Sequence, residues 1–284
     1  MNILVIGRTG QVATELQRRC PEGWRMTALG RDGADLTQPD LCARVVLDHD
    51  ADAIINAAAY TDVDRAEDEE GVANLVNGEA PAAMAAAAAK KGLPFLHISS
   101  DYVFDGSGTD PWMPEDATGP LGAYGRSKLL GEQGVAAAGG AYAILRTSWV
   151  FSAHGKNFVK TMLRLGETRD TIRVVSDQVG GPTPASDIAT ALLTMAEGLH
   201  SGAGESGTFH FSGGPDVSWA DFARVIFERA KMKVAVEDIE ATGYPMKAQR
   251  PANSRLDCQS LRLKYGIDRP DWRRGLDDVL REVG

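Results

Sequence analysis

A tyrosine and a lysine lie four positions apart in the stretch AYGRSKLL, as Tyr124 and Lys128. Residues with this spacing share one face of a helix in any protein, so the spacing alone assigns no function. The chemistry that the pair would suit is reduction of a ketone, in which the carbonyl oxygen must receive a proton. A phenol can supply that proton if its pKa, about 10 when unperturbed, is brought toward neutrality. A lysine one turn along the helix would favour the phenolate and would also bind a ribose hydroxyl.

Two serine hydroxyls precede this pair at the end of an apolar run. The stretch LPFLHISS (93–100) reads as a buried strand and ends with Ser99 and Ser100. Ligands of open parallel sheets bind at the carboxyl ends of the strands, so we expect Ser100 at the nicotinamide end of a cofactor. There it would donate a second hydrogen bond to the developing alkoxide. His97, inside the same strand, is expected to be structural.

A glycine turn joins the first predicted strand to the first predicted helix. The stretch GRTGQVA holds Gly7, Thr9, Gly10 and Ala13. A phosphate-binding turn needs one glycine to leave the strand sharply, a second where the backbone approaches the pyrophosphate, and a small residue where helix packs on strand. The helix N-terminus then offers unpaired N–H groups to the phosphates. This turn predicts a dinucleotide site, and the missing Lys-Ser/Thr argues against a P-loop.

The end of the second predicted strand indicates which dinucleotide binds. An NAD enzyme places an acidic residue there for the ribose hydroxyls, whereas this chain has Gly30 and Arg31. An arginine can pair with the 2′-phosphate of NADP and stack near the adenine. Asp32 or Asp35 could still serve the ribose. We therefore expect NADPH, with NADH as the alternative cofactor.

Short apolar runs alternate with helical stretches through the first half of the chain. Strands are predicted near 2–7, 25–30, 51–59, 93–100 and 142–150. The alternation predicts an α/β fold of the Rossmann type, a doubly wound parallel sheet with helices on both faces. Residues 1–150 would form the dinucleotide-binding domain, with the sheet completed by about 170–178 through the stretch IRVVSD. Residues 151–284 would form a smaller C-terminal α/β lobe that binds the substrate.

The bulk composition is that of an ordinary globular protein. The chain has 284 residues, 43% hydrophobic and 24% charged, with a net charge of −9. The acidic balance disfavours nucleic acid or an anionic membrane as the main partner, and no apolar run approaches the roughly 20 residues that span a bilayer. Three scattered cysteines, Cys20, Cys42 and Cys258, form no zinc or disulfide pattern. Because free thiols suit a reducing compartment, we expect a cytoplasmic protein.

The motifs together resemble the dTDP-4-dehydrorhamnose reductase family of the extended short-chain dehydrogenase/reductase superfamily. The matching stretches, in order, are GRTGQVATEL, INAAAYTDVDRAE, SSDYVFDG, YGRSKLLGE, LRTSWVF, NFVKTML, DQVGGPT and RPANSRLD. The glycine turn reading GQV and the tryptophan in RTSWV are rather specific to that family. The resemblance implies NADPH-dependent reduction of the C4 ketone of dTDP-4-dehydro-β-L-rhamnose, a small-molecule sugar nucleotide, to dTDP-L-rhamnose. A homodimer is among the arrangements that it allows.

The resemblance also implies roles for individual residues. Tyr124 would be the proton donor and Lys128 its modulator, and Ser100 stands where many members carry threonine. Ser100, Asp101 and Trp149 would touch the sugar nucleotide, although Trp149 would otherwise be read as a core aromatic. With the turn and strand residues described above, the cofactor contacts would be Gly7, Thr9, Gly10, Gln11, Val12, Gly30, Arg31, Asp35, Leu36, Ala59, Tyr60, Thr61, Tyr124 and Lys128.

Two polar features have more than one reading. Arg250, in QRPANSRLD, could pair with the substrate's diphosphate through both guanidinium arms or lie on the surface. The resembling family is associated with Mg²⁺ held by acidic residues at a subunit contact. Glu15 matches one of those positions, but Ser186 stands where another carboxylate is expected. Because hard cations need several oxygen ligands, we expect no metal, with Glu15 as the one candidate ligand.

Two other functions fit part of the same pattern. A sugar-nucleotide epimerase or dehydratase of the same superfamily would keep tightly bound NAD and usually shows a GxxGFxG turn, which Gln11 and Val12 replace here. A non-catalytic NADP-binding regulatory subunit, like that of methionine adenosyltransferase, would keep the fold without turnover. All three catalytic side chains are present, which favours an enzyme.

Overall fold

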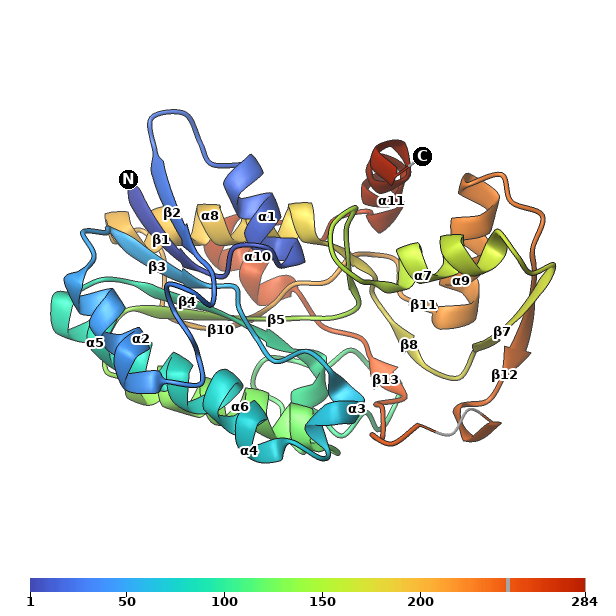
Figure 1. Cartoon of the computed structure of the whole chain (residues 1–284), viewed down its shortest axis with the longest axis horizontal. Helices are drawn as coiled ribbons and strands as arrows, with labels where there is room; N and C mark the ends of the chain where they lie inside the picture. The colour runs from blue at the N-terminus through green and yellow to red at the C-terminus, as the bar shows by residue number, and fades with distance from the viewer. Residues whose placement is uncertain (244–245, 284) are drawn as a thin grey trace.

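A six-stranded parallel sheet forms the centre of the molecule (Figure 1). The computed structural model describes residues 1–243 and 246–283. The strand order is β10-β5-β4-β3-β1-β2, and every neighbouring pair is parallel. This order confirms the predicted doubly wound fold, because the chain winds one way from β1 to β2 and the other way from β3 to β5. The bounds are β1 Asn2–Ile6, β2 Arg25–Leu29, β3 Ala53–Asn56, β4 Phe95–Ser100, β5 Tyr142–Thr147 and β10 Gly207–His210.

Helices cover both faces of this sheet (Figure 1). Alternate residues of each strand point to opposite faces, so Ile3 and Val5 join one core and Leu4 and Ile6 join the other. Since both faces are buried, the strands read as continuous apolar runs, which is why the sequence revealed them. One face carries α1 Gln11–Arg18, α8 Ala185–Ser201 and α10 Gln259–Tyr265, and the other carries α2 Pro39–Asp48, α5 Ala80–Lys91 and α6 Ala123–Ala137.

A wide helical turn, η1 (Leu75–Glu79), leads directly into α5 and has π-helical hydrogen bonding. Asn77 at its centre is fully buried. Its side chain accepts a hydrogen bond from the backbone N–H of Tyr60 and donates one to the hydroxyl of Ser127. The turn therefore connects the loop after β3 to α6. Shorter helical segments nearby are α3 Val63–Ala66, α4 Glu70–Asn74 and the 3-10 turn η2 Asp101–Val103.

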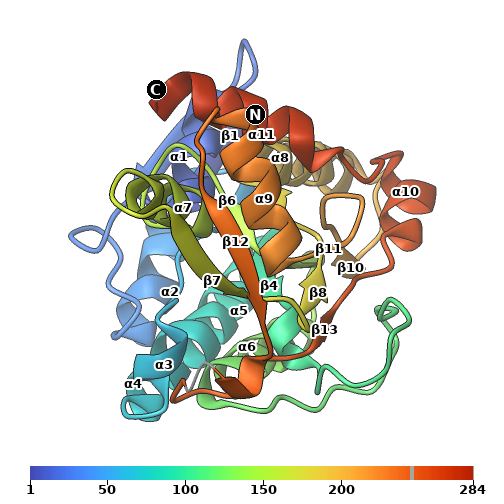
Figure 2. The same cartoon turned by 90° about the vertical axis from the view of Figure 1, so that its right-hand side faces the viewer.

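Most of the chain beyond residue 150 lies beside the carboxyl ends of the sheet (Figures 1 and 2). It has a separate apolar core, in which Phe151, Phe222 and Trp272 pack together. Its elements are β6 Val150–Phe151, α7 Phe158–Gly166, β7 Thr171–Val175, β8 Val179–Gly180, β9 Thr183–Pro184, β11 Val217–Ser218, α9 Trp219–Arg229, β12 Ala235–Ile239, η3 Ala241–Gly243, β13 Asn253–Ser254 and α11 Trp272–Val283.

The stretch IRVVSD does not complete the central sheet, and that expectation was wrong. It contributes to β7, whose sole partner among the described residues is β12, in a two-stranded sheet. In β7, Ile172 and Val174 are buried whereas Thr171 and Arg173 are exposed, an alternation typical of a strand with one solvated face. The sixth central strand is β10, which follows α8, so both elements come from beyond residue 150. The division into a cofactor domain (1–150) and a substrate lobe (151–284) therefore stays a proposal about binding roles.

The longest described helix is α8, with 17 residues, and it buries one side against the sheet. Within residues 1–243 and 246–283, no helix combines the length and apolar character needed to cross a membrane.

Candidate active site

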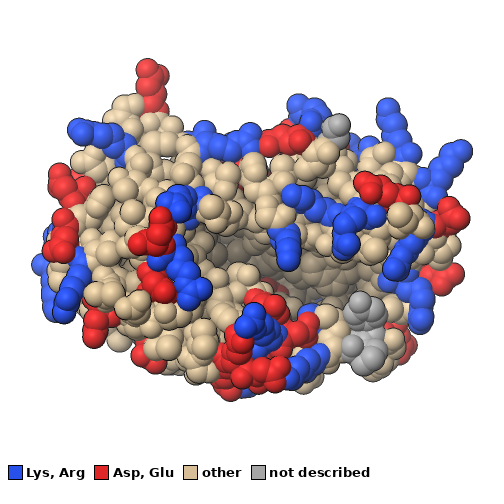
Figure 3. Space-filling model, viewed as in Figure 1, with Lys and Arg blue, Asp and Glu red and all other residues tan. Residues whose placement is uncertain are grey.

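A cleft of about 1340 Å³ opens at the carboxyl ends of the central strands. Figure 3 shows a hollow in the middle of this face of the molecule, with basic side chains along its upper edge and an acidic cluster below it. The structure brings nearly all the predicted site residues together along this cleft. The predicted residues that line it are Gly7, Thr9, Gly10, Gln11, Val12, Gly30, Arg31, Asp35, Leu36, Ala59, Tyr60, Thr61, Ser100, Asp101, Tyr124, Lys128 and Trp149.

The glycine turn has the geometry of a phosphate cradle. Gly7 has φ +114°, and a Cβ there would lie 3.2 Å from the backbone of Ala57, the residue after β3. Only glycine adopts that conformation at little cost. Helix α1 starts after Gly10, and no side chain caps its N-terminus. The first backbone N–H groups of α1 are therefore available to the phosphates of a dinucleotide.

Two arginines lie where the second strand ends. Arg31 is exposed and pairs with Asp35 at 3.2 Å. Arg8, which the sequence reasoning missed, also lines the cleft and pairs with Asp32 at 3.0 Å. Two hydrogen bonds from Thr37, backbone first and then side chain, lower the pKa of Asp35, with Arg31 contributing less. Guanidinium groups bind phosphate as well as carboxylate, so both side chains have the chemistry to bind a phosphate.

Tyr124 occupies the first turn of α6 and is half-buried in the cleft. That turn is fixed from outside the helix, because Glu67 accepts a hydrogen bond from the backbone N–H of Ala123 at 2.8 Å. The ring of Tyr102 packs edge-on against the ring of Tyr124, with 5.3 Å between centroids. Gly125 permits this approach, since a Cβ there would lie 2.2 Å from the carbonyl oxygen of Tyr102.

The pKa of Tyr124 is raised to about 12, and the expectation of a lowered value was wrong for the protein alone. Burial is the largest cause and the charge of Asp101 the second, while a hydrogen bond with Ser100 partly offsets them. Lys128 is not among these causes, and its Nζ donates to the carbonyl oxygen of Ile98 at 2.7 Å. Tyr124 is therefore a fully protonated phenol at neutral pH.

Lys128 and Asp101 are both buried ionisable groups on the cleft wall. Burial lowers the pKa of Lys128 to about 8, with Glu132 acting in the opposite direction. Burial also raises the pKa of Asp101 to about 6, opposed by hydrogen bonds with Ser254 and Ser100. Such perturbed groups gathered in one cleft are typical of active sites.

Trp149 lines the cleft rather than the core. Its backbone has φ +49°, a left-handed conformation that non-glycine residues rarely adopt outside functional sites. Its ring stacks on Trp219 at the start of α9, with 3.6 Å between centroids and 11° between planes. Sequence reasoning missed Trp219, because only the folded chain brings residues 149 and 219 together.

Arg250 is not among the residues that line the cleft. Its guanidinium group instead contacts the carboxylate of Asp64 at 2.9 and 3.3 Å. The side chain is only 19% exposed in this ion pair, and contact with the substrate's diphosphate stays a prediction.

The surroundings of Glu15 do not fit a divalent cation. Its buried carboxylate contacts Arg18 at 3.3 Å, Arg19 at 3.4 Å and His154 at 3.0 Å. These basic side chains take the positions that further oxygen ligands would need. Among the described residues, no group of three or more His, Cys, Asp or Glu side chains is arranged to hold a metal.

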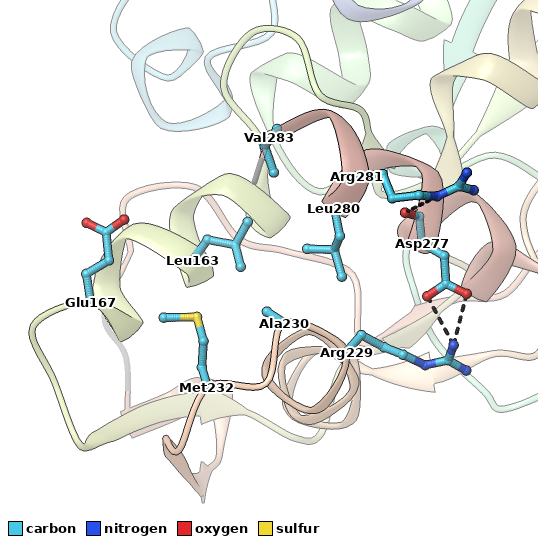
Figure 4. Close-up of a pocket in the computed structure, with 9 residues that line it drawn as sticks. All are labelled: Leu163, Glu167, Arg229, Ala230, Met232, Asp277, Leu280, Arg281 and Val283. Carbon is cyan, nitrogen blue, oxygen red and sulfur yellow. Dashed lines mark hydrogen bonds and ion pairs between the residues drawn. The ribbon is translucent and has the colours of Figure 1, made fainter.

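A second hollow, of about 560 Å³, lies between α7, α9 and α11 (Figure 4). Leu163, Met232 and Leu280 point into it, and an ion pair between Arg229 and Asp277 at 2.9 Å closes one side. The cleft at the strand ends, in contrast, gathers a phenol, an amine and several hydroxyls. That cleft is the candidate active site.

Comparisons with known proteins agree along the whole chain. A model of the RmlD substrate binding domain matches residues 1–284. The chain is 45% identical to a dTDP-4-dehydrorhamnose reductase of Sinorhizobium fredii (strain NBRC 101917 / NGR234), covering 96% of this chain and 94% of the relative. It is 43% identical to one from Burkholderia thailandensis, covering 100% and 99%. The solved dTDP-4-dehydrorhamnose reductase of Bacillus anthracis str. Ames in complex with NADP superposes with a TM-score of 0.93, at 34% identity and 99% coverage of both chains.

Proposed function

We infer the function from one premise, that this chain belongs to the RmlD substrate binding domain family. It reduces the C4 ketone of dTDP-4-dehydro-β-L-rhamnose to dTDP-L-rhamnose with NADPH. The observation that carries this function is a full-length match to dTDP-4-dehydrorhamnose reductases, together with a cleft that holds Tyr124, Lys128 and Ser100. The NADP complex of the Bacillus anthracis relative supports the choice of cofactor.

The glycine turn and the two arginines would hold the cofactor. The N–H groups at the start of α1 would bind the pyrophosphate, and Arg8 and Arg31 would bind the 2′-phosphate. NADPH, when bound, supplies the hydride. Lys128 would bind a ribose hydroxyl, as its position on the cleft wall allows. Dispersed contacts from Leu36, Ala59 and their neighbours would complete the binding.

Tyr124 would donate the proton that the C4 oxygen needs. Its raised pKa means that it carries this proton throughout the neutral range. The resulting phenolate must then be stabilised, and the charge of Lys128 would do so. Ser100 would also donate to the substrate oxygen as negative charge develops there.

The substrate would occupy the part of the cleft next to the residues beyond 150. Trp149 and Trp219 offer a stacked aromatic surface, and Asp101 offers a carboxylate close to Tyr124. A pyrimidine base or a sugar face packs well on such rings. The proposed substrate site thus draws on both parts of the chain, Trp219 from beyond residue 150 and Trp149 and Asp101 from before it.

The NAD-dependent epimerases and dehydratases share the fold alone. The solved dTDP-glucose 4,6-dehydratase DesIV is 17% identical, with a TM-score of 0.78. The curated relatives at 43–45% identity are reductases, and the chain retains a complete set of reacting side chains. A non-catalytic regulatory role has no comparable support.

Two wider properties belong to the same proposal. We place the enzyme in the cytoplasm, in keeping with its three free cysteines. We also propose that it forms a homodimer, as the family resemblance allows, and light scattering of the purified protein tests this. A mass equal to a single chain at micromolar concentration would contradict it.

The direct test follows the absorbance of NADPH after addition of dTDP-4-dehydrorhamnose. We expect stoichiometric oxidation of NADPH and formation of dTDP-L-rhamnose. The matched control is dTDP-glucose, which has a hydroxyl at C4 and should leave NADPH unchanged. A purified protein that carries stoichiometric NAD⁺ and consumes no NADPH would favour an epimerase or dehydratase instead.

A further inference from the structure

His97 lies fully buried in the middle of β4, between Asn56 of β3 and Ile144 of β5. Its place in an apolar strand predicts a structural role, yet both of its ring nitrogens have polar partners. Nδ1 lies 3.1 Å from the side-chain amide of Asn56, and Nε2 lies 3.2 Å from Nζ of Lys128. The imidazole therefore contacts the amine that is assigned to support the tyrosine.

The Lys128 amine is held by the strand beneath it. Besides His97, its Nζ contacts the carbonyl oxygen of Ile98 at 2.7 Å. An ammonium group has three N–H bonds, so these two partners leave one for the cleft. Glu132, one turn further along α6, cannot replace them, because Arg146 binds both of its carboxylate oxygens at 2.9 and 2.7 Å.

Helix α6 packs closely around the contact between Lys128 and His97. Gly131 lies one turn after Lys128 on α6, and a Cβ there would already lie 3.4 Å from Nε2 of His97. The same Cβ would lie 2.1 Å from the carbonyl oxygen of Asn77 in η1. A side chain at residue 131 would therefore clash with η1 and force α6 to shift, and Lys128 would shift with it.

The Asn56–His97 pair can serve both protonation states of the lysine. The ring is neutral, because burial and the charge of Lys128 hold the pKa of His97 well below its usual value. The side-chain oxygen of Asn56 accepts a hydrogen bond from the backbone N–H of Ala58 at 3.2 Å. The side-chain nitrogen of Asn56 therefore faces Nδ1 of His97. In this arrangement the ring proton lies on Nε2, which can donate it to the Lys128 amine when that amine is unprotonated. Turning the amide over gives up the bond from Ala58, moves the ring proton to Nδ1 and leaves Nε2 to accept from the ammonium.

We propose that His97 is a positioning residue, which holds the Lys128 side chain in the cleft in both of its protonation states. Asn56 would select the ring tautomer. The inference rests on the proposed function, in which Lys128 binds the cofactor ribose and stabilises the Tyr124 phenolate.

The test compares His97→Gln with His97→Asn. The glutamine amide reaches the place of Nε2, whereas the shorter asparagine amide reaches only the place of Nδ1. Both are neutral amides, so a loss of imidazole packing affects both. We expect His97→Asn to lower kcat on the order of 10- to 100-fold, as when a partner that orients a functional ligand is removed. His97→Gln should retain most of the wild-type rate.

Two further readouts separate positioning from folding. The Kd for NADPH, measured by fluorescence without substrate, should rise in His97→Asn and stay close to wild type in His97→Gln. The alkaline limb of the kcat profile, where Lys128 loses its proton, should move to lower pH in His97→Asn because the ammonium has lost an acceptor. Glu132 with Arg146, and Tyr124 with Asp101, are the other ionisable groups around this interface, and both variants leave them unchanged.

Asn56→Asp provides a second route if His97→Asn does not fold. A carboxylate only accepts, so it would keep the ring proton on Nδ1 and favour the ammonium, moving the alkaline limb to higher pH. The proposal would be overturned if all three variants kept the wild-type kcat, the wild-type Kd for NADPH and the wild-type alkaline limb of the pH profile. A wild-type protein that binds NADPH but does not reduce dTDP-4-dehydrorhamnose would refute the proposed function, while the NADPH affinities would still decide the role of His97.

Discussion

At the scale of single residues, the reaction depends on which groups in the cleft hold a proton. Tyr124, with its pKa raised to about 12, holds one at any physiological pH. Asp101, with its pKa raised to about 6, has mostly lost its own at pH 7. The cleft thus pairs a proton donor with a nearby carboxylate that is already charged, so the two groups have distinct tasks.

Tyr124→Phe removes the donor and leaves the ring. We expect kcat to fall by about 10²- to 10⁴-fold, the usual contribution of a positioned general acid. The measurement is NADPH oxidation with saturating dTDP-4-dehydrorhamnose. Tyr265→Phe is the matched control, since it removes a phenol on α10 whose hydroxyl donates only to the backbone oxygen of Glu205. A Tyr124→Phe variant with full activity would contradict the assignment.

Arg8→Ala and Arg31→Ala should each weaken the binding of NADPH more than the binding of NADH. Both side chains are at least half exposed, so solvent screens their charge and the loss is modest. We expect KM for NADPH to rise by up to about tenfold, or about 1.4 kcal/mol, with little change for NADH. Paired kinetics with the two cofactors provide the internal control. An equal change in KM for both cofactors would show that neither arginine binds the 2′-phosphate.

Sequence reasoning reached the site residues whose type and local spacing carry information. The Tyr124–Lys128 spacing and the Gly7–Gly10 turn are local patterns, and the structure brings both to one cleft. Trp219 and Arg8 were missed because their relevance depends on neighbours that folding supplies. The pKa of Tyr124 was also misjudged, since burial outweighs the other influences on it and is invisible in sequence.

At the scale of elements, the close packing of α6 on β4 and η1 sets the position of Lys128. Gly131 makes this packing feasible, as its missing side chain lets the helix approach the carbonyl oxygen of Asn77. Gly131→Ala should therefore lower the free energy of unfolding by about 1–3 kcal/mol, the usual cost of overpacking. Denaturant unfolding measures this cost.

Gly71→Ala is the control for that prediction. Gly71 also lies in a helix, α4, but a Cβ there would meet nothing within 4 Å. Alanine should therefore stabilise this helix by about 0.5–1 kcal/mol. If both substitutions shift stability in the same direction, the packing argument for Gly131 fails.

The elements that sequence predicted well are those buried on both faces. Strands β1, β4 and β5 are short apolar runs that follow or precede clear helices. Strand β7 was placed in the wrong sheet, because a run of β-branched residues does not reveal its partner. The π turn η1 was not predicted, since it depends on the contacts that Asn77 makes with Tyr60 and Ser127.

At the scale of the whole molecule, the buried amine of Lys128 lowers the free energy of unfolding, although the proposed function requires this amine. The pKa of Lys128 falls from 10.5 to about 8 on folding, which corresponds to a cost of about 3 kcal/mol below pH 8. Between pH 8 and about 10.5 the unfolded chain holds the proton that the folded chain has lost, so this cost declines as pH rises.

Lys128→Met should therefore be inactive and yet more stable than wild type at pH 7, by up to about 3 kcal/mol. The advantage should shrink as pH rises from 8 toward 10.5. Unfolding in denaturant across this pH range measures it, at pH values where the wild type unfolds reversibly. A stability difference that does not change with pH would indicate that the lysine's charge is not its source.

The stacked rings of Trp149 and Trp219 join the loop after β5 to the start of α9, across the mouth of the cleft. Two indoles in such close contact couple their electronic transitions and give a paired circular-dichroism band in the ultraviolet. Any ligand that slides between them, or draws the loop and α9 apart, would change that band. If the substrate binds at these rings as proposed, the band would change on binding, without a label and before any hydride has moved.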